Sequence, residues 1–294
     1  MAQLNRLWRR PLLFIGLFIV LTINGVQAEF KQGLLWKVEK EGYTASYVFG
    51  TMHSTDPRVL DLTAQIKPML LDSGQFAMEL LFTPDVALKM QTAMFFQDDK
   101  RLDQMLDQAL FQKLQEQLAF YGIPAPMVHQ FKPWAAMITI SLPPQMQGEF
   151  LDLALHNLAR ERGKPAFGLE TVEEQVAVFE NLSLKAQTAL LVESIKNHHK
   201  LETELEKLTQ AYLDRNLALL TTLSEEQMDT VDPAIKEAFM EGIAIKRNHT
   251  MVAAMLPLMQ RDGTFVAVGA LHLPGEEGVL QLLQNRGFKI SRVF

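Results

Sequence analysis

Two short segments of the sequence place a histidine three residues after a glycine. Gly50 precedes His53 in one run of β-forming residues, and Gly269 precedes His272 in another. Imidazole is the commonest protein metal ligand and also carries protons near neutral pH. A glycine at this spacing lets the backbone turn sharply and approach a ligand closely. His53 and His272 are therefore candidate metal ligands, and the alternative is a pair of histidines with structural roles at strand ends.

Two glutamates end apolar runs of the same kind. Glu79 lies within the apolar run 75–81, where a carboxylate is costly to bury unless it is paired or binds a metal. It is a candidate metal ligand and proton carrier, or half of a structural salt bridge. Glu170 ends the run 165–170 and is a second candidate proton carrier. The alternative for Glu170 is the acidic start of a helix with Thr171 as its N-cap.

Arg247 is a candidate partner for these carboxylates. It precedes a helical pattern that leads into the segment with His272, and it can neutralise a carboxylate or stabilise an oxyanion. The alternative is a surface arginine. The other histidines lie in polar or helical surroundings typical of surface positions. The sequence contains no His-Glu-x-x-His motif, phosphate loop or Gly-x-Ser-x-Gly elbow.

Composition limits the chemistry further. The 294-residue chain has no cysteine, which excludes disulfides, thiolate nucleophiles and cysteine-based zinc sites. Its 48% of hydrophobic and 21% of charged residues are typical of a globular protein. The net charge is −6, and it becomes −9 without the first 28 residues, which carry three arginines and no acid. An acidic body without a basic run is a poor match for nucleic acid, so we expect no nucleic-acid partner.

The first 28 residues have the pattern of an export signal. Three arginines precede the short apolar segment 12–21, and Ala28 follows at a position where a signal peptidase would cut. We expect cleavage after Ala28, a periplasmic or secreted protein, and a single domain over 29–294. The alternative is an uncleaved anchor in the inner membrane, for which the apolar segment is short.

The hydrophobic pattern predicts an α/β fold. Apolar, β-rich runs alternate with segments whose apolar residues recur every three or four positions. This alternation predicts a central, mostly parallel sheet with flanking helices and a large helical insertion at about 84–246. We expect strands at 34–39, 45–53, 75–81, 165–170, 264–272 and 288–294, and helices at 60–71, 84–95, 248–259 and 276–285. In open α/β sheets, ligands bind outside the carboxyl ends of the strands, so the candidate residues should meet in one crevice.

The order of these motifs resembles the TraB/GumN/TIKI family over about 34–294. The resemblance rests on FGTMH at 49–53, MEL at 78–80, GLET at 168–171, RN at 247–248 and VGALHL at 268–273. One departure concerns Asp152, which lies four residues after Gly148, whereas the family often has an aspartate closer to its glycine. We therefore leave Asp152 out of the catalytic set.

The resemblance implies a core similar to those of erythromycin esterases and haem-uptake lipoproteins. It also implies a divalent-metal site formed by the motif residues. TIKI members are similar to metal-dependent proteases that act on secreted signalling proteins, with manganese or cobalt supporting activity. TraB members are linked to shutting down a peptide pheromone, and GumN members lie with polysaccharide genes. The resemblance thus indicates a peptide or protein substrate less firmly than it indicates the site.

Three functions follow as hypotheses. The first is an exported metal-dependent hydrolase, a peptidase, in which His53, His272 and Glu79 hold manganese, cobalt or zinc. Glu79 or Glu170 would move the proton, and Arg247 would stabilise negative charge or orient a carboxylate. The second is a non-catalytic periplasmic binding protein for a peptide, metal or polysaccharide fragment. The third is a structural partner in an envelope assembly, for which both histidines would be dispensable.

Overall fold

A computed structural model describes residues 30–143 and 149–294 of the chain. The expected export signal, at 1–28, lies outside the described residues. Within those residues, every helix is too short or too polar to serve as a membrane span.

A six-stranded mixed sheet forms the centre of the structure, as the sequence predicts. The strand order is β4-β3-β5-β2-β1-β6. The first four of these strands run parallel, and β1 pairs antiparallel with both β2 and β6. The strands are β1 (Leu35–Glu39), β2 (Ser46–Thr51), β3 (Gln75–Met78), β4 (Ala166–Gly168), β5 (Thr264–Gly269) and β6 (Lys289–Arg292).

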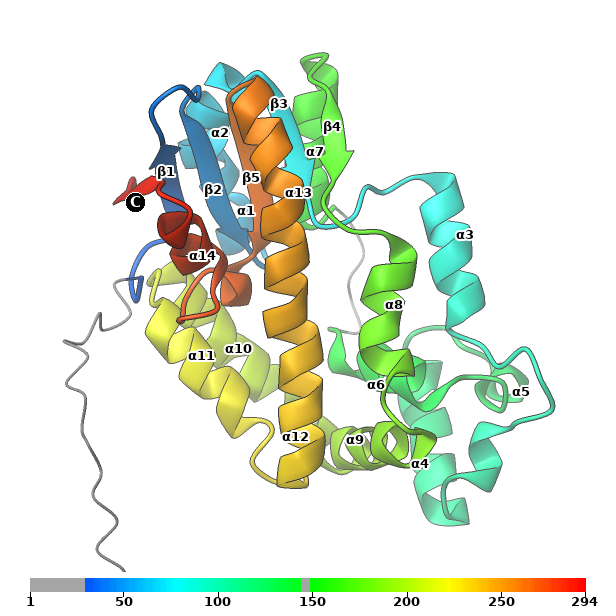
Figure 1. Cartoon of the computed structure of the whole chain (residues 1–294). Coiled ribbons are helices and arrows are strands. Elements are labelled where there is room, and N and C mark those ends of the chain that lie inside the picture. Colours follow the sequence, from blue (N-terminus) through cyan, green and yellow to red (C-terminus); the bar gives the residue numbers. More distant parts are fainter. Residues whose placement is uncertain (1–29, 144–148) are drawn as a thin grey trace, which may run out of the picture.

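Helices cover both faces of this sheet and extend beyond one end of it (Figure 1). The first half of the chain contributes α1 (Pro57–Leu60), α2 (Leu62–Asp72), α3 (Pro84–Ala93), η1 (Leu102–Gln104), α4 (Gln108–Ala119), α5 (Ala125–Val128) and α6 (Pro133–Ser141). The second half contributes α7 (Leu151–Glu161), α8 (Val172–Glu180), α9 (Leu184–Asn197), η2 (His198–Lys200), α10 (Leu201–Leu213), α11 (Leu217–Glu226), α12 (Pro233–Met240), η3 (Glu241–Lys246), α13 (Arg247–Arg261), η4 (Ala270–His272) and α14 (Val279–Asn285).

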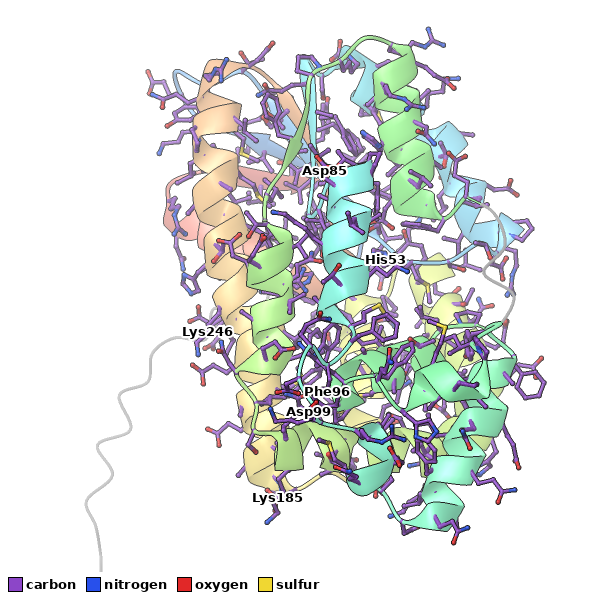
Figure 2. All side chains as sticks on the ribbon, turned by 90° about the vertical axis from the view of Figure 1, so that its right-hand side faces the viewer. His53, Asp85, Phe96, Asp99, Lys185 and Lys246 are labelled. Atoms are coloured by element: carbon purple, nitrogen blue, oxygen red, sulfur yellow. The ribbon has the colours of Figure 1, made fainter. Side chains whose placement is uncertain are left out.

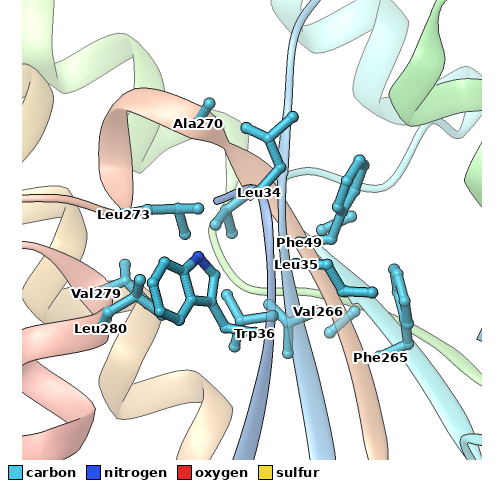
Figure 3. Close-up of a cluster of buried hydrophobic side chains, with 14 of the residues drawn as sticks. Leu34, Leu35, Trp36, Phe49, Phe265, Val266, Ala270, Leu273, Val279 and Leu280 are labelled. Carbon is cyan, nitrogen blue, oxygen red and sulfur yellow. The ribbon is translucent and has the colours of Figure 1, made fainter. Parts of the chain in front are cut away.

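The sheet layer has a continuous hydrophobic core. Helices α13 and α14 lie on one face of the sheet, and α2 and α7 lie on the other (Figure 1). Every residue of β3 is buried, which matches a strand that is covered on both faces. Figure 3 shows part of this core, where apolar side chains of β1, β2 and β5 meet those around η4 and α14. This packing fixes the turn that carries His272.

A second core lies in the helical middle of the chain. Helices α4, α6 and α9 pack together around a separate cluster that includes Leu114, Trp134 and Leu191. Two segments of the middle return to the sheet layer, because α7 packs against β3 and β4 forms the edge strand next to β3. Helix α13, at the end of this region, runs back along the sheet and carries Arg247 as its first residue.

Five of the six predicted strands end two or three residues earlier than the sequence suggests, and the two longest differences are those of β3 and β5. The strand predicted to reach residue 81 ends at Met78, and the strand predicted to reach residue 272 ends at Gly269. The backbone N–H of Gly269 donates to the Glu79 carboxylate at 2.7 Å instead of continuing the ladder with β3. The chain then forms the 3-10 turn η4, which places His272 beneath the sheet edge.

Candidate functional site

The predicted side chains collect at the carboxyl edge of the four parallel strands. The strand register aligns Thr51 of β2 with Gly269 of β5, and Met78 of β3 with Gly168 of β4. The four parallel strands therefore end at the same edge of the sheet. His53, Glu79, Glu170 and His272 follow β2, β3, β4 and β5, respectively, within three residues.

The two motif glycines make this crowded edge possible. A Cβ atom at Gly50 would lie 2.7 Å from Leu273 Cδ1 and 3.0 Å from the Cα of Ala270, so η4 packs directly on this glycine. A Cβ atom at Gly269 would lie 3.3 Å from Glu79 Oε1, close to the tightest contact that Cβ atoms make. The two glycines thus allow close approach, as the sequence predicts. Turn η4 packs directly on β2 at Gly50, and Glu79 packs directly on β5 at Gly269.

Glu79 and Glu170 share a single arginine. Arg247 Nη2 lies 2.6 Å from Glu79 Oε2 and 2.6 Å from Glu170 Oε2, and Arg247 Nε donates to Glu170 Oε1 at 2.9 Å. Only 1% of the Glu170 side chain is exposed, and Gln175 Nε2 donates a further hydrogen bond to it. Burial lowers the pKa of Arg247, but the hydrogen bonds to Glu170 and the two carboxylate charges outweigh that effect and raise it. The guanidinium therefore remains charged and fixes both glutamates.

A π-helical segment precedes this arginine. Helix α12 continues through η3 into α13 without a break in helical backbone geometry, and η3 is the π-helical part. A π-helical insertion changes which side chains share a helix face, and such insertions are frequent at functional sites. Arg247 and Asn248 follow it directly, and both are turned towards the sheet edge.

Asn248 fixes the orientation and tautomer of His272. The Asn248 amide group donates through Nδ2 to the carbonyl oxygen of Glu277 at 2.7 Å, so its Oδ1 is the acceptor for His272 Nδ1 at 2.6 Å. His272 Nδ1 must then carry the hydrogen, which leaves Nε2 with a free lone pair. That Nε2 lies 3.7 Å from Glu79 Oε1. Burial lowers the pKa of His272 to about 4, despite the opposing charge of Glu79, so the imidazole is neutral at physiological pH.

Glu79 is the common neighbour of these groups. Burial raises the pKa of Glu79. The charge that His272 carries at acidic pH, the charge of Arg247 and the hydrogen bond from Gly269 reverse that effect and lower the pKa to about 2. Glu79 is therefore ionised across the physiological range. A buried, ionised carboxylate next to a neutral imidazole is a suitable pair of donors for a divalent cation.

His53 lines the same cavity as Glu79 and is held by Asp152. His53 Nδ1 donates to Asp152 Oδ2 at 2.9 Å, and the Thr51 hydroxyl donates to Asp152 Oδ1 at 2.6 Å. Burial lowers the pKa of His53, but the charge of Asp152 and its hydrogen bond raise it to about 9. With 54% of its side chain exposed, His53 is the most accessible of the predicted residues.

Asp152 belongs to this cluster of side chains, although the motif pattern does not predict it. It is 2% exposed and lies in the first turn of α7, where the helix dipole favours a carboxylate. Its position departs from the motif spacing, so the pattern does not assign it to the site. A helical signal was nevertheless present, because Asp152 shares the buried face of α7 with Leu155 and Ala159. A carboxylate on an apolar helix face needs a polar partner, and here the partners are Thr51 and His53.

A cavity of about 390 Å³ opens beside His53. His53, Glu79 and Asp152 line one side of it, and Gln175 lies at the same wall. In Figure 2, His53 lies next to α3 on the outer side of the molecule. His272, Glu170 and Arg247 are not among the lining residues. They adjoin the cavity through Glu79, and Glu170 also does so through Gln175.

The donor set fits a divalent cation, although the side chains as they lie are not arranged around one point. No group of three His, Asp or Glu side chains in 30–143 and 149–294 has the geometry to hold a metal ion. The hydrogen bonding of the two imidazoles does match that of a metal site. Nδ1 of each is bound to an oxygen acceptor, as is almost always so for histidines that ligate a metal. The net charge of these side chains also favours a cation. Glu79, Glu170 and Asp152 are three carboxylates and Arg247 is one guanidinium, which leaves −2 when both imidazoles are neutral.

Fold and site together define an α/β protein with a buried Glu–Arg–Glu and His centre at the carboxyl edge of its parallel strands. The sequence model of the TraB/PrgY/gumN family matches residues 34–292, which is nearly the whole chain. The chain therefore belongs to the TraB/PrgY/gumN family, and the prediction from its motifs is confirmed. Neither the curated proteins nor the solved structures contain a significant match.

Proposed function

We propose that this protein is an exported metal-dependent hydrolase that acts on peptides or secreted proteins. The observation that carries the proposal is the arrangement around Glu79. An ionised carboxylate has a neutral imidazole with a free Nε2 at 3.7 Å and lines the same cavity as a second imidazole. In this proposal His53, His272 and Glu79 hold manganese, cobalt or zinc. When bound, such a cation supplies Lewis acidity and lowers the pKa of water next to it.

The remaining residues hold these donors in place. Asp152 orients His53, and Asn248 orients His272, each through Nδ1. Arg247 holds Glu79 at the sheet edge and is itself held by Glu170. Glu170 is buried beneath Arg247 and does not line the cavity, so we assign it a positioning role in place of proton transfer. For the same reason Arg247 orients a carboxylate and does not contact the substrate.

The two candidate proton carriers that line the cavity, Glu79 and His53, are better suited to hold the cation. Glu79 faces the cavity, but a pKa of about 2 makes it a weak base and a better cation ligand. His53 lines the same cavity, and the pKa of about 9 means that the metal-free protein carries a proton there. Metal ligands must be deprotonated, so binding of a cation at His53 releases that proton.

The test of the hydrolase proposal is peptide cleavage. Purified protein covering residues 29–294 is incubated with a peptide library and manganese, zinc or cobalt, and the products are read by mass spectrometry. We expect cleavage that a chelator abolishes and that the added metal restores. The His53→Ala/His272→Ala double variant should be inactive under the same conditions. Binding of peptides without any cleavage would instead support a binding protein on the same scaffold.

A further inference from the structure

One wall of the cavity beside His53 belongs to helix α3. This helix has no buried residue, although Val86, Ala87, Met90 and Met94 form an apolar stripe at helical spacing. All four of these side chains line the cavity, and Met90 and Met94 also pack against the core of the helical layer. The apolar face of α3 thus points towards the same space as His53.

An ion pair links α3 to α8, and a side-chain cap begins the helix. Lys89 Nζ lies 2.8 Å from Glu173 Oε1 of α8, and the Thr83 hydroxyl caps the helix by accepting from the Val86 N–H. Figure 2 shows α3 in front of the sheet layer, with Asp85 near its upper end and His53 beside it. The helix is therefore placed to form a wall over the candidate centre, and its apolar stripe is available to a ligand.

Aromatic side chains continue this wall towards His53. The rings of Phe82 and Phe150 pack edge to face with centroids 5.2 Å apart, and the Phe150 ring lies 5.4 Å from the His53 ring. Phe82 is 40% exposed and lines the cavity. Phe82 thus joins the apolar wall of the cavity to Phe150, which contacts His53. Apolar and aromatic linings of this kind are typical of ligand sites.

Methionine side chains make this wall adaptable. Met78, Met90 and Met94 all line the cavity. Their unbranched and polarizable side chains fit apolar groups of different shape, as at surfaces that bind varied peptides. On the α3 side, Thr83 and Gln91 are the only polar side chains among the lining residues of the described chain. A sugar would leave most of its hydroxyl groups without partners against this wall, whereas an apolar side chain would not.

We propose that this cavity is a specificity subsite for one large apolar side chain of a peptide substrate, of the leucine, methionine or phenylalanine class. The inference rests on the proposed function, because it places the neighbouring peptide bond beside His53 and Glu79. The volume of about 390 Å³ is within the range of about 300–1,000 Å³ for ligand pockets, so the cavity has room for a large side chain together with the peptide backbone next to it.

Binding can be tested without turnover. Methyl-¹³C-methionine labelling of the full mature chain gives signals for Met78, Met90 and Met94, which single Met→Leu substitutions assign. The probes are two blocked tripeptides that differ only in a central leucine or alanine. We expect the leucine peptide to shift these three signals and to bind about tenfold more tightly than the alanine peptide, because it buries more apolar surface.

Variants of α3 provide matched controls. Val86→Asp adds a charge to the apolar wall in the first turn of the helix, where an acid favours helix formation, and Ala87→Trp fills the cavity. Both should remove the preference for leucine. Leu88→Asp makes the same type of change on the same helix at a side chain that is 63% exposed and outside the cavity, so it should keep the preference. Circular dichroism checks that each variant is folded.

The outcomes separate this inference from the proposed hydrolase. Leucine-selective binding at these methionines without cleavage in the presence of metal would keep the subsite and overturn the hydrolase. Cleavage that is indifferent to the side chain would keep the hydrolase and overturn the subsite. Equal affinity for the two peptides, or shifts confined to other methionines, would also overturn the subsite.

Discussion

Asp152 Oδ2 lies 2.9 Å from Nδ1 of His53, and this contact joins the start of α7 to the chain that follows β2. It defines the orientation of the one imidazole that faces the cavity. The same carboxylate accepts from the Thr51 hydroxyl, so both of its oxygens are in use. The contact shows that the site depends on a residue from the helical middle as well as on the sheet edge.

The first prediction concerns the charge of His53. In the metal-free protein, Asp152→Asn should lower the pKa of His53 from about 9 to near or below its ordinary value of 6.5, because the charge that opposes burial is lost. NMR titration of the His53 ring measures this change. Asp56→Asn, which alters a partly exposed carboxylate near His53 in sequence that pairs with Arg58, is the control and should leave the titration unchanged.

The same contact predicts how stability depends on pH. The pKa of His53 is raised in the folded state, so the stabilisation from its charged form is fully present below pH 6.5 and is lost as pH rises through about 9. The contribution is small because His53 is half exposed. Urea unfolding of the metal-free wild type and of Asp152→Asn should therefore differ more at pH 6 than at pH 10. A difference that grows with pH would contradict this account.

The third prediction concerns Arg247. Arg247→Ala leaves two buried carboxylates without their counter-charge, so the free energy of unfolding should fall by about 3–5 kcal/mol. Arg247→Lys should recover only part of the loss, because one ammonium group cannot reproduce the forked contacts with both glutamates. Urea denaturation at neutral pH provides the measurement. Arg58→Ala removes an exposed pair of ion contacts and should have little effect.

The fourth prediction concerns Asn248. Asn248→Ala removes the acceptor that fixes the His272 tautomer, so affinity for manganese or zinc should fall by about 10–100-fold. A competition titration with a chromophoric chelator reports the affinity. His249→Ala changes the next residue, which makes an exposed contact with Glu277, and it should bind metal as the wild type does. Equal loss in both variants would indicate damage to α13 and no specific role for Asn248.

Much of the fold follows from local pattern. The apolar run that contains Glu79 becomes the buried strand β3, as the sequence predicts. Thr171 caps α8, as the alternative interpretation of the segment after Glu170 predicts, and Glu174 completes a capping box. Parallel strands then bring their carboxyl ends together without further information. This is why Glu79 and His272 could be placed in one region from the sequence alone.

Other features depend on contacts that the sequence does not display. The position of α3 is set by packing and by its ion pair with α8, so its apolar stripe could not be assigned to a cavity wall. The role of Arg247 depends on η3, whose π-helical geometry has no clear sequence signal. Glu170 was predicted next to the site, but only the structure shows that it lies beneath Arg247 and outside the cavity.

Metal content of the purified protein tests the central claim most directly. Residues 29–294 and the His53→Ala/His272→Ala double variant are each supplied with manganese, zinc or cobalt, freed of excess metal, and measured by plasma mass spectrometry. The account predicts about one divalent metal per wild-type chain and none in the folded double variant. Absence of bound metal from both proteins, or equal amounts in both, would contradict a metal centre formed by His53, Glu79 and His272.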